Sequence, residues 1–189
     1  MTRYHLSVTA PMLLIGLLWG VPVQAQWSLV DTLLTRAERG SADAQFNLAV
    51  RYDFGEGVSE DATEAARWYR LAAEQGHAAA QFNLAVSYAF GEGVSEDDTE
   101  AIRWYRLAAE QGHADAQFNL GVSYADGEGI SKDAVQAYMW LDLAAARGTG
   151  EQREEAARLR DLTADAVMTP EQISKAQGLP RERETAHPR

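Results

Sequence analysis

The sequence contains no cysteine, which removes several classes of chemistry at once. Without a thiol the chain cannot form a disulfide framework, a thiolate metal site, a cysteine nucleophile or a lipidated cysteine at its amino terminus. Basic residues are also scarce, because 17 Lys and Arg stand against 28 Asp and Glu and give a formal net charge of -11. A surface of that sign repels phosphate backbones and anionic lipids, so nucleic-acid binding is not expected.

The chain also lacks an apolar run of the length that a membrane helix needs. Residues 10–23 are shorter than the roughly 20 apolar residues of a bilayer span, and prolines and glycines interrupt them. They follow Arg3 and His5, and residues 23–25 then place small side chains where a signal peptidase cleaves, a pattern typical of a secretory signal peptide. We predict that residues 1–25 are cleaved and that the mature chain is periplasmic or secreted. An uncleaved anchor or a buried helix is the alternative.

Catalytic signatures are absent as well, including S-x-x-K, G-x-S-x-G, H-E-x-x-H, phosphate-loop and dinucleotide patterns. His77 and His113 precede equivalent helices, and we interpret them as solvated loop residues rather than metal ligands. Acidic residues recur in the turns, for example Glu56 and Glu92. We interpret the acids at helix starts as favouring the positive ends of helix dipoles, rather than as calcium ligands. No metal or cofactor is predicted.

What the sequence does contain is an internal repeat. Residues 37–72 match residues 73–108 at 29 of 36 positions, and a more divergent third copy occupies residues 109–144. Self-similarity at a fixed period of this size is the signature of a solenoid, in which each unit buries its apolar face by stacking on its neighbours.

Each copy has the pattern of two helices. In the first copy, residues 42–54 carry apolar side chains at helical spacing and end at Gly55, which can take the left-handed conformation at a helix end. Residues 62–75 form the second helix, which Asp61 and Glu64 open as a capping box. The sequence therefore predicts an all-α solenoid of three helix pairs, assigned to residues 41–148.

An amino-terminal capping helix is expected in residues 26–40. Leu29, Leu33 and Leu34 lie at helical spacing there. Such a helix would cover the apolar face that the first repeat leaves open.

Two carboxy-terminal capping helices are expected in residues 149–178. The second begins at Pro170, since proline is favoured at the first helical position, and it stops at Gly178. We expect the remaining residues, 179–189, to be a disordered tail.

The second helix of the third copy carries an apolar patch where the other copies are mostly polar. Val135, Tyr138 and Met139 form this patch, which requires a cover. We predict that residues 170–176 fold back through Ile173, together with the preceding helix, and cover it. A dimer or partner surface at this end is the alternative.

The repeat resembles a known family. The pattern A-x-A-Q-F-N-L-A-x-x-Y, then G-E-G-V, then A-x-x-W-Y-x-x-A-A-E-Q-G, is similar to the Sel1-like repeats, which are related to tetratricopeptide repeats, over residues 37–148. The resemblance implies a right-handed helical solenoid that acts as an adaptor or scaffold. Some secreted relatives hold each repeat with a disulfide and are linked to β-lactam binding, an activity that a chain without cysteine does not support.

The first helices are apolar on a second side, opposite the face that carries Leu48 and Tyr52. This stripe either packs against the neighbouring repeat or lines a groove for a partner peptide; it comprises Phe46, Val50, Phe82, Val86, Phe118 and Val122. Flanking amides suit either a peptide backbone or ties between repeats. They are Gln45, Gln81, Gln117, Asn47, Asn83 and Asn119.

The predicted function is therefore a non-catalytic scaffold for protein–protein interaction in the cell envelope, acting as a monomer or a weak homo-oligomer. Its predicted partner is a protein or peptide. Two alternatives remain, an envelope hydrolase or β-lactam-binding enzyme and a purely structural oligomer.

Overall fold

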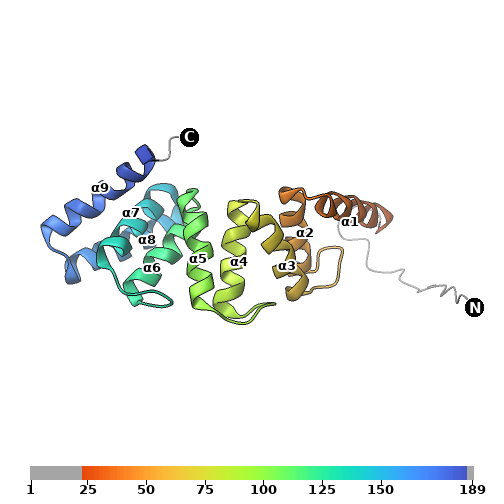
Figure 1. Cartoon of the computed structure of the whole chain (residues 1–189), viewed down its shortest axis with the longest axis horizontal. Helices are drawn as coiled ribbons and strands as arrows, with labels where there is room; N and C mark the ends of the chain where they lie inside the picture. Colours follow the sequence, from red (N-terminus) through yellow and green to blue (C-terminus); the bar gives the residue numbers. More distant parts are fainter. Residues whose placement is uncertain (1–22, 187–189) are drawn as a thin grey trace, which may run out of the picture.

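The computed structural model describes the backbone of residues 23–186 and the side chains of residues 30–179. This part of the chain is an elongated stack of nine α-helices without a strand (Figure 1), which confirms the all-α class. The helices are α1 (Val23–Glu38), α2 (Ala42–Phe54), α3 (Ala62–Glu74), α4 (Ala78–Phe90), α5 (Asp98–Glu110), α6 (Ala114–Asp126), α7 (Ala134–Arg147), α8 (Gly150–Val167) and α9 (Pro170–Ala186). Residues 1–22, most of the predicted signal peptide, lie outside the described residues.

Local capping fixes the helix boundaries, but only the Asp61 half of the predicted capping box is present, because the Glu64 carboxylate accepts from Arg67 and the Asp61 N–H donates to the Tyr52 carbonyl oxygen. The Asp61 side chain accepts hydrogen bonds from the backbone N–H groups of Thr63 and Glu64 at the start of α3. Gly55 ends α2 with a left-handed φ of 67°, a conformation that costs glycine no steric clash. The same cap types recur in the second and third repeats, so the three helix pairs share one geometry.

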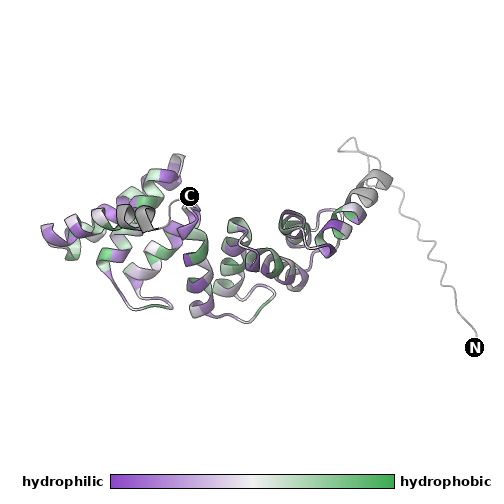
Figure 2. Ribbon diagram, turned by 45° about the horizontal axis from the view of Figure 1, so that its top comes forward, coloured by the Kyte–Doolittle hydropathy of each residue, from purple (hydrophilic) through white to green (hydrophobic). Residues whose placement is uncertain are grey.

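The core consists of residues that recur once in each repeat. First helices contribute buried leucines and second helices contribute buried tryptophans; they are Leu48, Leu84, Leu120, Trp68, Trp104 and Trp140. Each such side chain contributes about 1.5 to 3 kcal/mol when fully buried. Figure 2 shows that hydrophobic and hydrophilic residues alternate along the helices, as expected when each helix buries one face.

The turns between first and second helices pack against the preceding repeat. A Cβ atom added at Gly93 would lie 2.0 Å from the carbonyl oxygen of Ala62, and one at Gly129 would lie 2.7 Å from that of Asp98. Both glycines also have positive φ. The turns of successive repeats therefore lie along one edge of the solenoid, in contact with the starts of α3 and α5.

At the amino-terminal end, α1 takes the place of the second helix of a preceding unit. Val30 and Ala37 are buried, and Leu33 and Leu34 pack against the core. The side chain of Leu29 lies outside the described side chains. The expected amino-terminal helix is present, and it covers the open face of the first repeat.

At the carboxy-terminal end, α9 folds back onto α7 (Figure 1). Ile173 packs against the core cluster that contains Tyr138 and Met139, and Ala176 is fully buried. The Gln177 amide donates a hydrogen bond of 3.2 Å to the Tyr138 hydroxyl. The predicted cover over the apolar patch is thus confirmed.

The end of α9 differs from the prediction. The helix continues through Gly178 to Ala186, so the expected stop at Gly178 is wrong, as is the expectation that residues 179–186 are disordered. Gly178 has no positive φ, and Leu179 packs against the core beyond it. Because an interior glycine costs a helix only about 1 kcal/mol, this contact can carry the helix past it. Residues 187–189 lie outside the described residues.

Candidate partner-binding surface

Two phenylalanines of the predicted stripe lie at the junctions between repeats. The Phe46 ring stacks on the His77 imidazole, with ring centroids 4.6 Å apart, and lies 6.0 Å from the Tyr69 ring. Phe82 stacks on His113 in the same way, at 4.7 Å. Both phenylalanines are half-buried. They join one repeat to the next, and part of each ring is left at the surface.

The third phenylalanine has different neighbours. Thr149 occupies the position that His77 and His113 occupy in the earlier junctions. Phe118 instead packs against a small cluster of buried alanines at the α7–α8 contact, which is formed by Ala144, Ala145 and Ala156. The three valines of the stripe are also half-buried; they are Val50, Val86 and Val122.

The glutamines of the predicted groove are not at the surface. The Gln81 amide donates to the Ala73 carbonyl oxygen at 3.0 Å, and its own oxygen accepts from Gln111 at 2.7 Å. The equivalent glutamines Gln45 and Gln117 donate to the preceding repeat in the same way. These amides therefore tie one repeat to the next, rather than binding the backbone of a partner peptide. This corrects the expectation that Gln45, Gln81 and Gln117 face a partner, because all three are buried.

The last of these ties is incomplete. Arg147 occupies the position at which Gln75 and Gln111 donate in the earlier repeats. The side-chain oxygen of Gln117 is therefore left buried without a hydrogen-bond partner in the described part of the chain. A buried acceptor that no donor contacts loses its hydrogen bonds to water, and no hydrogen bond within the protein replaces them.

Restoring the donor should stabilise the chain. We expect Arg147→Gln to have a free energy of unfolding about 1 kcal/mol higher than Arg147→Ala, because only glutamine can donate to Gln117. Both variants lose the same charge, so the alanine variant is the matched control. Urea denaturation measures the difference, and equal stability of the two variants would show that the Gln117 oxygen needs no donor.

The asparagines of the predicted groove do not share one environment. Burial raises the pKa of Tyr69, Asp53 raises it further, and a hydrogen bond from Asn83 acts in the opposite direction. Asn119 makes the corresponding hydrogen bond to Tyr105. The residue of α1 equivalent to Tyr69 and Tyr105 is Leu33, so Asn47 has no tyrosine hydroxyl to bond. Asn47 is exposed.

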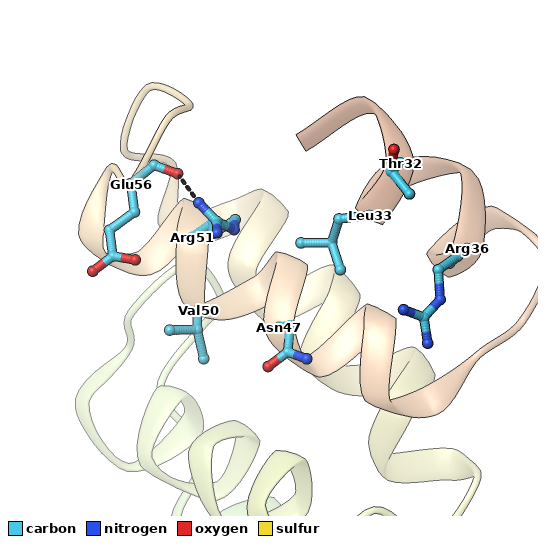
Figure 3. A pocket seen from close by; sticks show the side chains of 7 residues that line it. All are labelled: Thr32, Leu33, Arg36, Asn47, Val50, Arg51 and Glu56. Carbon is cyan, nitrogen blue, oxygen red and sulfur yellow. Dashed lines mark hydrogen bonds between the residues drawn. The ribbon is translucent and has the colours of Figure 1, made fainter. Parts of the chain in front are cut away.

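Asn47 belongs to a shallow pocket between α1 and α2 (Figure 3). Arg51 donates a hydrogen bond of 2.9 Å to the Glu56 carbonyl oxygen at one side of it. The lining residues are Thr32, Leu33, Arg36, Asn47, Val50, Arg51 and Glu56. Asn47 and Val50 are thus the predicted groove residues that line this open site.

The histidines are structural, which corrects their interpretation as solvated loop residues. Each side chain is only 21% exposed. The Nδ1 atom of His77 accepts from the backbone N–H of Ala80 at 3.2 Å, and that of His113 accepts from Ala116 at 3.4 Å. They are therefore N-caps of α4 and α6. The sequence allowed this capping role to be predicted, because Ser41, a common N-cap residue, occupies the equivalent position in the first repeat.

The His113 cap should make stability depend on pH. Burial lowers the pKa of His113, and the charge of Asp115 opposes this only in part. Below the ordinary histidine value of about 6.5 the unfolded chain therefore binds more protons, so stability falls as the pH drops from about 6.5 through the lower folded value. We expect the melting temperature to fall across this window.

His113→Ser is the matched variant for this prediction, because serine keeps a cap but does not titrate. Thermal unfolding of both proteins between about pH 7.5 and pH 5 should show a smaller fall for the variant. Parallel curves would mean that protonation of His113 does not couple to folding.

Two aromatic side chains that the sequence analysis did not select are the most exposed large hydrophobic side chains of the repeats. Phe54 and Phe90, at equivalent positions at the ends of α2 and α4, are 69% and 70% exposed. The third copy has Asp126 at this position. A charged residue at the equivalent position of the third copy indicates that this position lies at the surface.

Two further observations concern the described residues as a whole. No helix among them has the length and apolar character needed to cross a membrane. Nor do three His, Cys, Asp or Glu side chains come together in this part of the chain in a way that could hold a metal ion.

Comparison with known families identifies the repeat. The family model of the Sel1 repeat matches residues 42–77, 78–113 and 114–149, so each match covers one helix pair. The chain belongs to the Sel1 repeat family. Sel1 repeat proteins generally act as protein-interaction scaffolds and are typically non-catalytic. No curated protein matches the chain.

Solved structures of Sel1 repeat proteins are similar to this chain. A protective antigen of uropathogenic Escherichia coli with an SLR fold is 36% identical with a TM-score of 0.71, over 82% of this chain and 32% of the antigen. A Sel1 repeat protein from Oxalobacter formigenes is 40% identical with a TM-score of 0.62, over 69% of this chain and 98% of that protein. This chain thus spans about a third of the length of the antigen.

A more distant neighbour shares the fold alone. Cysteine-rich protein B of Helicobacter pylori is 17% identical with a TM-score of 0.56, over 74% of this chain and 98% of that protein. This chain lacks cysteine entirely, so the shared helical arrangement here depends on packing and on the amide and histidine junctions.

Proposed function

We propose that this Sel1 repeat protein is an exported, periplasmic scaffold that binds a protein or peptide partner without catalysing a reaction on it. The observation that carries the proposal is the partial exposure of apolar side chains along the first helices, at Val50 beside the exposed Asn47 in the pocket and at the rings of Phe46 and Phe82. A stacked repeat presents such groups over an extended surface, which suits a protein partner better than a small substrate.

The polar side chains that invite a catalytic interpretation have structural explanations. His77, His113, Asp61 and Asp97 cap helices, and the buried glutamines join repeats. This favours a scaffold over the envelope hydrolase and β-lactam-binding alternatives. Turnover by the purified chain that one substitution abolished would overturn this part of the proposal.

Export is tested by the amino terminus of the protein in the cell. The signal-peptide interpretation expects a periplasmic protein whose sequence begins at Gln26. Cell fractionation followed by amino-terminal sequencing measures both properties. An intact terminus at Met1 in the cytoplasmic fraction would contradict it.

Partner binding is tested by photo-crosslinking in the bacterium that carries the protein. A benzophenone amino acid replaces the exposed Asn47 in one variant and the exposed Arg103, on a second helix, in the control. The proposal expects a heterologous crosslink from position 47 that is absent from position 103, with the partner identified by mass spectrometry. Crosslinks to a second copy of the chain alone would favour the structural oligomer.

A further inference from the structure

Phe54 and Phe90 have no explanation in the packing of the solenoid. Both are about 70% exposed, and both are the last residues of their helices, directly before a glycine turn. One exposed phenylalanine on a protein surface is ordinary. Here two exposed phenylalanines occupy equivalent positions in consecutive repeats, on the same edge. The packing of the repeats buries neither ring, so together they mark an apolar surface.

Both rings lie beside turns that carry glutamates. A Cβ atom added at Gly55 would lie 3.6 Å from the backbone nitrogen and Cβ of Glu60, and one added at Gly91 would lie 3.5 Å from those of Glu96, so a glutamate lies close to the glycine that follows each phenylalanine. Four glutamates stand in the two turns without a salt bridge in the described part of the chain; they are Glu56, Glu60, Glu92 and Glu96. The four carboxylates of the two turns outnumber the guanidinium at the first turn, that of Arg51, which donates to the Glu56 carbonyl oxygen, so the rings lie in a net negative field.

The two turns belong to one continuous edge. Gly93, in the second turn, lies against Ala62 at the start of α3, directly after the first turn. Both α2 and α4 contact α3, and neighbouring helix axes lie about 8 to 10 Å apart, so the axes of the two helices that end in Phe54 and Phe90 are about 20 Å apart.

We propose that Phe54 and Phe90 anchor a basic, extended segment of a protein partner along this edge. Its apolar side chains contact the two rings, and its lysines or arginines face the four glutamates. An extended strand covers about 20 Å in roughly six residues, so the two apolar side chains of the partner lie about six positions apart. A second copy of this chain is not the occupant, because its own edge has the same negative charge.

This inference rests on the proposed scaffold function but names a different surface from the pocket at Asn47. A heterologous crosslink from position 47, combined with failure of the experiment below, would keep the scaffold function and reject the Phe54 and Phe90 edge. The two proposals therefore fail separately.

The probe is a fluorescent peptide of about 12 residues with two leucines six positions apart and lysines and serines elsewhere. Fluorescence anisotropy measures its binding to the mature chain. We expect saturable binding that weakens as salt is added, and at least tenfold weaker binding to the double variant Phe54→Asp and Phe90→Asp. Asp126 shows that the fold accepts aspartate at this position. The added negative charge would strengthen attraction of the peptide, so a loss reports the missing rings.

Two controls complete the design. The double variant Leu162→Asp and Val167→Asp adds the same charge at exposed apolar positions of α8 and should bind the peptide as the unaltered chain does. A peptide with glutamate in place of lysine should not bind. Failure of the unaltered chain to bind the lysine peptide, or equal binding by the Phe54 and Phe90 variant, would overturn the proposal.

Discussion

Gly93→Ala is expected to lower the free energy of unfolding by about 2 to 5 kcal/mol, the sum of left-handed strain and a backbone clash. The added Cβ atom would lie 2.0 Å from the Ala62 carbonyl oxygen, which belongs to the backbone and cannot rotate away. The second turn would have to leave the first repeat. Chemical denaturation of the purified protein measures the loss.

Gly76→Ala is the matched control for the Gly93 prediction. Gly76 has a φ of 88°, similar to the 70° of Gly93, but no atom lies within 4 Å of an added Cβ. It should cost only the conformational strain, about 1 to 2 kcal/mol. Equal losses for the two variants would mean that the turn does not depend on its close contact with Ala62.

A chain that ends at Thr169 should lose about 3 kcal/mol or more of stability and should self-associate. Removing α9 takes away Ile173, Ala176 and Leu179, and it uncovers Tyr138 and Met139. Met139 is fully buried in the intact chain, so its exposure leaves an apolar patch at the end of the solenoid.

A chain that ends at Leu179 is the control for this truncation, because it keeps every described contact of α9. Thermal unfolding and light scattering compare the two. An unchanged melting temperature and mass for the chain ending at Thr169 would show that α9 does not stabilise the repeats.

The helices could be predicted from the sequence because their boundaries depend on local groups. Asp61 and Gly55 satisfy the ends of their own helices, and the 36-residue period repeats these caps in register. The cover formed by α9 was also predictable, since Val135 and Met139 replace polar residues of the sister repeats. In both cases the comparison between copies supplied the information that a single copy lacks.

The errors lie where a residue of one repeat acts on another. Whether Gln81 faces solvent depends on Gln111, which is 30 residues away in the chain. His113 is a partly buried cap because the Phe82 ring stacks on it. The end of α9 depends on the contact of Leu179 with the core, which outweighs a glycine that would otherwise favour a stop. Such contacts follow from stacking geometry, which a local pattern does not contain.

The candidate surface was predicted in part. Asn47 and Val50 line an open pocket, and Phe46 and Phe82 keep part of their rings at the surface. Phe54 and Phe90 were missed because they end the apolar face of their helices, where periodicity alone does not separate a core residue from an exposed one.

The central claim, that this Sel1 repeat protein binds a partner as a scaffold, is tested most directly by the mass of the purified complex. Light scattering on the mature chain, alone and mixed with the protein crosslinked at position 47, measures that mass. We expect a mass for the chain alone that stays constant from about 1 to about 100 µM and a larger, defined mass with the partner. A mass that grows with concentration and never includes a second protein would contradict the account.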